Sequence, residues 1–374
     1  MQKTESFSDR LIEKLATKSL DFHCHGVGRF DFTEIFDIQL QEIENILASR
    51  HHRSILTLYL PKPNFDDFLY LMEIFSRGKK AGRFNHIAGI ALEGPLLASH
   101  GGTPETGVWN PSKYHWKKFA ELGKKGLVYV IFSPDAPLDK HVSSTLFAPA
   151  PSAAWIAETL LDGGVLPTPG HFLKNDPIAS AKALQSVFDV VAAWGQGAAA
   201  TDHLFNDMPL NFKHAWRTKA DRERRDAEIK TLNLDSWTLR NLETKLGPVP
   251  ATIIRNAHKG LVKIAQNFDG EHVDLSIVKK AVELIGDDNI MMMTDSIESK
   301  RLAGRDLHMV EGSTLLYQDE GVVAAGTQGV QRQIQNMFSI GLSPTQIERI
   351  CGVNAAELLN QTSESMIYAK AHCL

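Results

Sequence analysis

Residues 87–95 read IAGIALEGP, and this stretch decides the class of fold. It is almost wholly apolar until the carboxylate of Glu93. A strand with one solvated face alternates apolar and polar residues, whereas a strand covered on both faces is a continuous apolar run. The stretch therefore predicts a strand of a parallel sheet that lies between layers of helices.

Seven further short apolar runs accompany this strand, separated mostly by helix-length stretches. They cover residues 18–24, 54–60, 127–133, 164–170, 197–203, 261–267 and 289–295. Apolar runs that alternate with longer amphipathic ones are typical of βα units. Eight such units favour a closed (β/α)8 barrel over an open sheet. We expect one barrel domain over residues 1–374, with a charged helical insertion near residues 208–250.

The composition argues against several classes of function. The net charge is -4 and the pI is near 6.4, so bulk electrostatics favour neither nucleic acid nor an anionic membrane. The three scattered cysteines fit a reducing compartment better than a disulfide scaffold. The N-terminal residues show no signal-peptide core, and no run of 18 apolar residues occurs. We expect a cytoplasmic protein that acts on a small molecule.

Metal-binding or acid–base side chains follow five of the eight predicted strands. They are His23 and His25, Glu93, His171, His203 and Asp295. The carboxyl ends of barrel strands meet on one face, where active sites of this fold form. Side chains at i and i+2 of a strand project to the same face, so His23 and His25 both point into the barrel mouth.

Four histidines and a carboxylate predict a transition-metal site. Such ligands suit zinc, which we favour, or iron or another transition metal, better than magnesium, which prefers oxygen ligands. The predicted ligands are His23, His25, Glu93, His171 and His203. They can hold one ion, or two ions bridged by Glu93, and the sequence leaves both arrangements open. Most of the other histidines, such as His51 and His86, are interpreted as ordinary core or surface residues.

Asp295 follows the last predicted strand and is the candidate catalytic base. A carboxylate beside a metal-activated water can take its proton and pass it to the leaving group. The alternative is that Asp295 caps the segment after the strand.

Two segments outside the strand pattern are predicted to be helical. Residues 208–250 include KADRERRDAEIK and are longer than an ordinary connection. They are either a solvated helical excursion or a lid over the active site. Residues 343–360 predict closing helices, with Ser343 as an N-cap ahead of Gln346.

An ordered series of short motifs resembles the N-acetylglucosamine-6-phosphate deacetylases of the amidohydrolase superfamily. The resemblance covers about residues 20–360. Its pieces are LEGP at 92–95, WNP at 109–111, GH at 170–171, TDHLFNDMP at 201–209, DGEHVD at 269–274, MTDS at 293–296, AGT at 325–327 and VNAAELL at 353–359. Any one piece is weak evidence, and their order and spacing together carry the resemblance.

The resemblance implies a role for each matching residue. Glu93, His171 and His203 match the shared metal ligands, and His23 and His25 match an H-x-H that some members keep. Asp295 matches the catalytic aspartate, and His272 matches a histidine that contacts substrate and polarises the scissile carbonyl. The predicted substrate-binding residues are Asn206, Asp207, His272 and Thr327. The implied reaction is removal of an acetyl group from an N-acetylated amino sugar phosphate, by a homodimer.

Three departures from the family pattern concern the substrate. Only 22 residues precede His23, so the family's small β-sandwich is expected to be reduced or absent. The expanded 208–250 segment hides the phosphate-gripping arginine, for which Arg217 and Lys213 are candidates. The loop after LEGP reads GGTPETGVWNP rather than the family's Lys-Gly-Ala-His segment. Two alternatives therefore stay open: hydrolysis of another N-acyl or cyclic amide, and a non-catalytic barrel that binds a sugar phosphate.

Overall fold

The computed structural model describes residues 7–34, 37–138, 151–195, 199–212 and 218–360. Each of the eight predicted apolar runs overlaps a strand. The strands are β1 (Leu20–Cys24), β2 (Arg53–Leu58), β3 (Ile87–Glu93), β4 (Leu127–Phe132), β5 (Leu166–Pro169), β6 (Ala200–Thr201), β7 (Lys263–Asn267) and β8 (Ile290–Met293). Strand β3, which has the sequence IAGIALE, is buried at all but one position, as its apolar sequence predicts.

The eight strands form two parallel segments of one curled sheet. The first segment has the order β1-β2-β3-β4-β5 and the second β6-β7-β8. Backbone hydrogen bonds join the segments at both junctions. At one, the N–H of Asp202 donates to the carbonyl of Pro169 (3.0 Å); at the other, the N–H of Asp295 donates to the carbonyl of His23 (2.9 Å) and that of His25 to the carbonyl of Ser296 (2.8 Å). The mixed α/β fold with a curled parallel sheet is thus confirmed. Among the described residues no ladder of paired strands crosses either junction, so the closed barrel stays a prediction.

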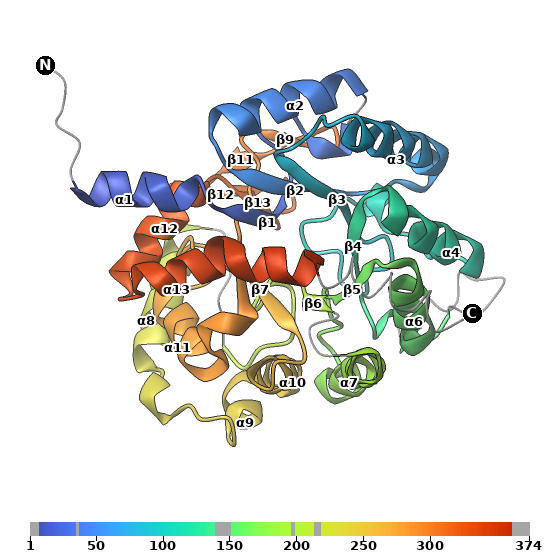
Figure 1. The fold of residues 1–374 in the computed structure, drawn as a ribbon. Coiled ribbons are helices and arrows are strands. Elements are labelled where there is room, and N and C mark those ends of the chain that lie inside the picture. Colours follow the sequence, from blue (N-terminus) through green and yellow to red (C-terminus); the bar gives the residue numbers. More distant parts are fainter. Residues whose placement is uncertain (1–6, 35–36, 139–150, 196–198, 213–217, 361–374) are drawn as a thin grey trace, which may run out of the picture.

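Helices surround the sheet (Figure 1). They are α1 (Phe7–Ala16), α2 (Asp37–Ser49), α3 (Phe65–Lys80), α4 (Lys113–Glu121), α6 (Ala153–Gly163), α7 (Pro177–Trp194), α8 (Lys219–Thr231), α9 (Leu242–Leu246), α10 (Pro248–His258), α11 (Leu275–Ile285), α12 (Val330–Ser339) and α13 (Pro344–Glu348). Successive helices α4, α6, α7 and α10 pack side by side. Right-handed βα connections place each helix beside the next in this way.

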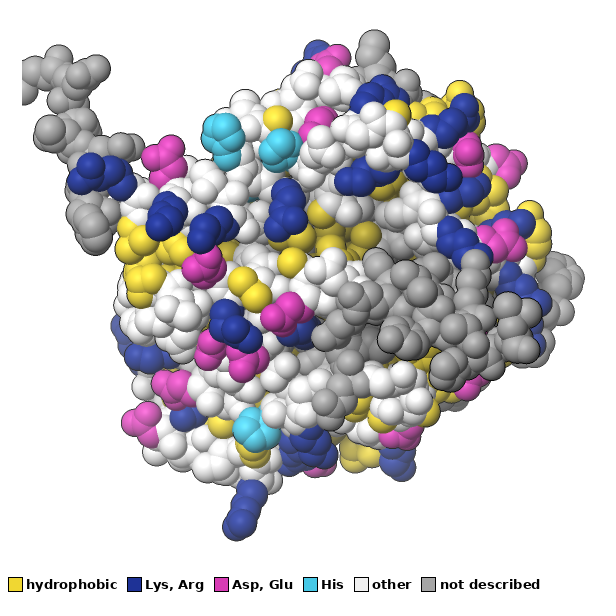
Figure 2. Space-filling view, viewed as in Figure 1, with side chains coloured by type: hydrophobic (Ala, Val, Ile, Leu, Met, Phe, Trp, Pro, Cys, Tyr) yellow, Lys and Arg dark blue, Asp and Glu magenta, His cyan; other side chains and the backbone are white. Residues whose placement is uncertain are grey.

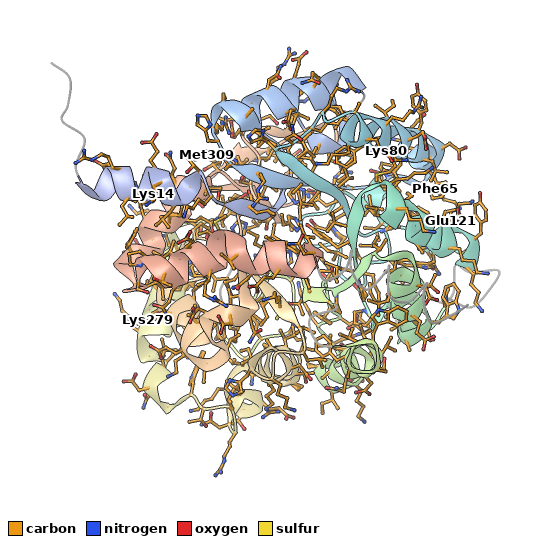
Figure 3. The ribbon with its side chains drawn as sticks, viewed as in Figure 1. Lys14, Phe65, Lys80, Glu121, Lys279 and Met309 are labelled. Atoms are coloured by element: carbon orange, nitrogen blue, oxygen red, sulfur yellow. The ribbon has the colours of Figure 1, made fainter. Side chains whose placement is uncertain are left out.

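The core has two main parts, one on each side of the sheet, and a third, small cluster that includes Ile297 and Leu316. Inside the curl lies a smaller apolar cluster that includes Phe22, Tyr129, Ile131 and Met291. The larger cluster fills the space between the strands and the helices. Exposed charged residues lie on the outer helices, where Figure 3 shows Lys14, Lys80 and Lys279. On the face shown in Figure 2, basic and acidic side chains are interspersed.

Two excursions leave the regular βα pattern. The predicted insertion near 208–250 contains α8, α9 and the first residues of α10. A second excursion, which the sequence analysis did not predict, lies between β8 and α12. It forms short antiparallel strands: β9 (Arg301–Leu302), β10 (Arg305–Asp306), β11 (His308–Met309), β12 (Leu315–Tyr317) and β13 (Val323–Gly326). The described residues contain no other strands, so no β-sandwich is present among them.

The predicted N-cap at Ser343 is confirmed. Its hydroxyl accepts a hydrogen bond from the backbone N–H of Gln346, and the Gln346 side chain accepts one from the backbone N–H of Ser343. This reciprocal arrangement satisfies N–H groups that the first turn of a helix leaves free. A π-helical turn over Arg349–Val353 follows α13 and leads into helical residues 354–360.

Candidate metal centre

The carboxyl ends of the strands bring all five predicted metal ligands and Asp295 into one buried cluster. The exposed fractions of these residues are 1% for His23, His25 and His171, 3% for Glu93, 5% for His203 and 7% for Asp295. Asp202, which the sequence analysis did not select, is buried among them at 2%. The polar atoms of these side chains fall into two groups that could each hold a metal ion.

The first group consists of Glu93, His171, Asp202 and His203. The Nε2 atom of His171 lies 2.8 Å from Oε1 of Glu93 and 3.3 Å from Oδ2 of Asp202. That same Asp202 oxygen lies 3.3 Å from Nε2 of His203. The ends of three strands, β3, β5 and β6, therefore direct two imidazoles and two carboxylates at one point.

The second group consists of His23, His25 and Asp295. The Nε2 atoms of the two histidines are 3.2 Å apart, and Nε2 of His25 lies 3.2 Å from Oδ1 of Asp295. Oε2 of Glu93 lies 3.1 Å from Nε2 of His23 and 3.2 Å from Nε2 of His25. Glu93 therefore contacts both groups, which is the position that a bridging carboxylate requires.

The donor atoms fit a metal ion better than a hydrogen-bonded cluster. Oε2 of Glu93, both carboxylate oxygens of Asp202 and Nε2 of His171 are buried without a hydrogen-bond partner. Buried polar atoms are normally hydrogen-bonded, and each exception needs an explanation. Two nitrogen ligands about 2.0–2.1 Å from one tetrahedral zinc lie roughly 3.3 Å apart. The spacings above are close to that value.

Outer hydrogen bonds orient two of the imidazoles toward the cluster. Nδ1 of His171 donates to Oδ2 of Asp207 at 2.8 Å, and Nδ1 of His25 donates to the carbonyl of Thr57 at 3.3 Å. A proton held on Nδ1 leaves the Nε2 lone pair facing the cluster. Metal-ligating histidines generally have such a partner, which fixes the tautomer and the ring orientation.

The carboxylates give the buried cluster a strongly negative electrostatic potential. Burial alone would lower the pKa of His25, but the hydrogen bond to Asp295 and the charge of Glu93 outweigh it and raise the pKa to about 10. The pKa of His171 is raised for the same reason by Asp202, Asp207 and Glu93, despite burial. The carboxylates thus favour positive charge nearby. A divalent cation can supply that charge while the imidazoles stay neutral.

His272, the residue predicted to polarise the scissile carbonyl, lies beside Asp295. Its Nε2 is 3.4 Å from Oδ2 of Asp295, and its Nδ1 is 2.5 Å from Oδ2 of Asp269. Burial would lower the pKa of His272, but the negative charges of Asp269 and Asp295 raise it to about 9. A protonated imidazole can donate a hydrogen bond to an oxygen that gains negative charge.

A cavity of about 420 Å³ opens onto the cluster. Five predicted site residues that line it are Glu93, His171, His203, His272 and Asp295. Asn206 and Asp207 line it as well, whereas Thr327 does not. Thr327 is exposed, and its hydroxyl donates to the carbonyl of Thr314. Arg217 and Lys213, the candidate phosphate-binding residues, lie outside the described residues.

The two carboxylate oxygens of Asp207 already have partners. Oδ1 accepts from Ser99 at 2.8 Å and lies 2.6 Å from Nζ of Lys174, while Oδ2 accepts from His171. Asp207 therefore orients a predicted metal ligand, and its predicted contact with substrate stays a prediction.

Three of these residues have backbone conformations that side chains rarely adopt. The φ angles are +54° for His171, +39° for Asp207 and +49° for Asp295. For residues other than glycine this region is strained, and such strain concentrates at functional sites. His171 and Asp295 lie just beyond a strand, where the chain must turn away while the side chain stays in the cluster, and Asp207 lies in the loop that follows β6.

The structure adds three residues that sequence reasoning missed. The first is Asp202, which was not selected from the sequence because the adjacent His203 was taken as the ligand. The hydroxyl of Tyr59 lies 3.1 Å from Nε2 of His25, and the two rings stack with centroids 4.8 Å apart. Lys174 lines the cavity three residues after His171. Tyr59 directly follows the last residue of β2, so the strand-end criterion would have found it if aromatic hydroxyls had been counted.

Known structures resemble this chain closely in fold and weakly in sequence. N-acetylglucosamine-6-phosphate deacetylase from Pasteurella multocida matches 92% of this chain and 76% of its own, with a TM-score of 0.65 and 15% identity. A mutant of the Mycobacterium smegmatis deacetylase, in complex with N-acetyl-D-glucosamine-6-phosphate, matches 92% and 77%, with a TM-score of 0.65 and 18% identity. The Thermotoga maritima deacetylase matches 92% and 78%, with a TM-score of 0.60 and 15% identity. The fold is shared with these deacetylases.

Sequence comparison adds nothing to this likeness. No family model matches the chain, and no curated protein sequence matches it. About a quarter of each deacetylase chain has no counterpart here. None of the helices in the described residues combines the length and apolarity that crossing a membrane requires.

Proposed function

We propose that this chain is a metal-dependent amidohydrolase that removes the acetyl group from an N-acetylated amino sugar phosphate. The observation that carries the proposal is the pair of converging ligand groups beside the His272–Asp295 contact, at the end of a cavity of about 420 Å³. The shared fold and the ordered motifs support the same reaction class. We further propose that residues 1–374 form one domain, in which the eight strands close into a barrel.

The predicted ligands His23, His25, Glu93, His171 and His203 would hold one or two divalent ions, with zinc favoured. A bound ion would polarise the scissile carbonyl and lower the pKa of water. Asp295 takes a proton from the attacking water and later delivers it to the amine nitrogen as the C–N bond breaks. The water oxygen stays on the acyl carbon, and the products are acetate and a free amine. His272 donates a hydrogen bond to the carbonyl oxygen as negative charge develops there.

Acetate release tests this function directly. The purified protein, loaded separately with zinc, iron or cobalt, should release acetate from N-acetylglucosamine-6-phosphate. Absence of turnover with every metal would contradict the proposed substrate. Metal analysis of the same samples separates a wrong substrate from a protein that takes up no metal.

Asp295→Asn tests the assigned base. We expect a loss of about 10²–10⁴-fold in kcat, the usual contribution of general acid–base catalysis, with at least one metal ion still bound. Asp31→Asn is the matched control, because Asp31 and Asp295 are both 7% exposed and Asp31 does not line the cavity. A near-normal kcat in Asp295→Asn would remove this residue from its role.

One observation favours a second candidate, an amidohydrolase of an uncharged N-acyl or cyclic amide. Lys174 is the lysine that lines the described cavity, and its ammonium group is already paired with Asp207 at 2.6 Å. An anionic substrate would have to compete with that carboxylate. A panel of N-acyl sugars with and without phosphate separates the two candidates, since equal kcat/KM for both forms would favour the second.

A further inference from the structure

Asp202 is a buried carboxylate without a hydrogen-bond partner at the centre of the site. It directly follows β6 and is only 2% exposed, and neither of its side-chain oxygens has a hydrogen-bond partner in the described residues. Burying an ionised carboxylate without compensation costs several kcal/mol, so such groups are paired or bind metals. The neighbouring groups are Nε2 atoms of two histidines at 3.3 Å and Nδ1 of His23 at 3.6 Å.

The backbone opposite Asp202 makes room for it. A Cβ atom at Gly170 would lie 2.6 Å from Cβ and 2.8 Å from Oδ2 of Asp202. Contacts this short do not occur between real side chains, so only glycine at position 170 allows the carboxylate to reach His171 in this conformation. The packing of β5 against β6 therefore directs Asp202 into the cluster.

Charge balance indicates what the carboxylate faces. Glu93, Asp202 and Asp295 are all buried and together carry three negative charges. With neutral imidazoles, one divalent ion would leave a net charge of −1 and two would leave +1. Two ions are therefore needed to neutralise all three carboxylates, and the second ligand group already offers a place for the second ion.

We propose that Asp202 is a metal ligand, and that it completes a four-ligand site with Glu93, His171 and His203. Four protein ligands are the number that a closed tetrahedral zinc site contains, whereas catalytic sites keep a position open. The ion in this four-ligand site is held tightly, and the ion at His23, His25 and Asp295, a group with three ligands, is held more weakly. The inference rests on the metal dependence of the proposed function and is independent of the substrate.

Metal titration of chelator-treated protein tests this assignment without substrate. Zinc binding to the wild type, followed by calorimetry and elemental analysis, should show two ions per chain in two affinity classes. Asp202→Asn should weaken the tight class by at least about 10-fold, since even partners outside the ligand shell change metal affinity by 10–100-fold. Asp31→Asn is the buried control and should change neither class. An unchanged tight class in Asp202→Asn, or one class of one ion in the wild type, would overturn the proposal.

X-ray absorption on the wild type provides a measurement that needs no variant. Protein loaded with one equivalent of zinc should show two imidazole and two carboxylate ligands, whereas three or more imidazoles would contradict the four-ligand site. If the metal titrations succeed and no N-acyl substrate is turned over, the proposed function fails and the role of Asp202 stands.

Discussion

Two regions of the molecule meet at the cavity and are built in different ways. One is the floor, which we define as the strand-end cluster of His23, His25, Glu93, His171, Asp202, His203 and Asp295. The other is the cover, which we define as the loop 99–104, helix α8 and residues 313–326. The floor is fixed by parallel strands whose backbones are hydrogen-bonded to one another. The cover is fixed by contacts between segments that lie far apart in the chain.

The contacts of the cover are specific and mostly reach backbone atoms. A Cβ atom at Gly102 would lie 2.4 Å from the carbonyl of Val323, so the loop 99–104 packs directly against β13. The side chain of Gln318 donates to the carbonyl of Gly102. Helix α8 contributes Arg225, which is 3% exposed and donates from Nη1 to the carbonyl of Glu271 at 3.0 Å. These contacts position groups around the cavity, whereas the floor supplies the chemistry.

Floor and cover should therefore respond differently to mutation, and Glu93→Gln should give the largest effect. Glu93 contacts His23, His25 and His171 at 2.8–3.2 Å, so its charge serves both ligand groups. We expect loss of bound metal and a fall of at least about 10³-fold in kcat/KM, because the metal activates the water and polarises the carbonyl. Elemental analysis and an acetate-release assay measure the two effects.

Glu44→Gln is the control for this prediction. Glu44 is 8% exposed and also pairs with a histidine, His86, but it lies away from the cavity. It should keep its metal and most of its activity. Equal losses of metal and of kcat/KM in the two variants would mean that Glu93 matters no more than any other buried carboxylate.

A change in the cover should reduce turnover and leave metal content unchanged. Arg225 holds the carbonyl of Glu271, the residue before His272, while Asp269 accepts hydrogen bonds from the N–H groups of both Glu271 and His272. Arg225→Met should lower kcat by roughly 10-fold, because misplacing a group that stabilises charge weakens the transition state. The pH profile of kcat should shift as well, since His272 loses its fixed position between Asp269 and Asp295.

Arg224→Met provides the comparison for Arg225. Arg224 is on the same helix, but its side chain is exposed and pairs only with Asp221 among the described contacts. It should leave kcat and its pH profile unchanged. Added guanidinium should restore part of the lost kcat of Arg225→Met and should not change the kcat of Arg224→Met. That result would show that the cover acts by positioning His272. A drop in metal content in Arg225→Met would instead show that floor and cover are not separable.

The floor could largely be predicted from the sequence because each of its groups follows a local pattern. Glu93 closes an apolar run, and the spacing of His23 and His25 places both on one face of a strand. Asp202 escaped prediction because the adjacent His203 was taken as the ligand from that strand end. Asp202 can reach the cluster because Gly170, directly after the neighbouring strand β5, leaves room for it. This contact joins residues 32 positions apart, and no local pattern contains it.

The cover could not be predicted in the same way. Strands β9–β13 have two to four residues each, too short for an alternating pattern to stand out. The charged sequence of α8 correctly indicated a helix, but its contact with Glu271 depends on folding across the sheet. The sequence left two alternatives for residues 208–250, a solvated helix or a lid over the active site. Helix α8 has features of both, since Arg225 is buried and Arg224 faces solvent.

The smallest expected effect concerns the segment that joins floor to cover. Just after Asp295, Glu298 forms a two-pronged ion pair with Arg50 and accepts the N–H of Gly28 at 2.8 Å. Burial would raise the pKa of Glu298, but Arg50 and this N–H outweigh it and lower the pKa. A lowered folded-state pKa stabilises the fold above the ordinary pKa of about 4.3, and this contribution disappears as the pH falls through the folded-state value.

Glu298→Gln should therefore lower the free energy of unfolding at pH 7 by about 0.2–1 kcal/mol, the usual range for a solvent-accessible ion pair. The difference from wild type should shrink steadily below about pH 4, as measured by denaturant titration at several pH values. Glu121→Gln removes an exposed pair with Lys118 on one helix turn and should change stability less. Because Glu298 touches neither ligand group, the variant should keep its metal and its turnover at neutral pH. A loss of metal would show that the floor depends on how the chain leaves it toward the cover, and the two regions would then have to be treated as one.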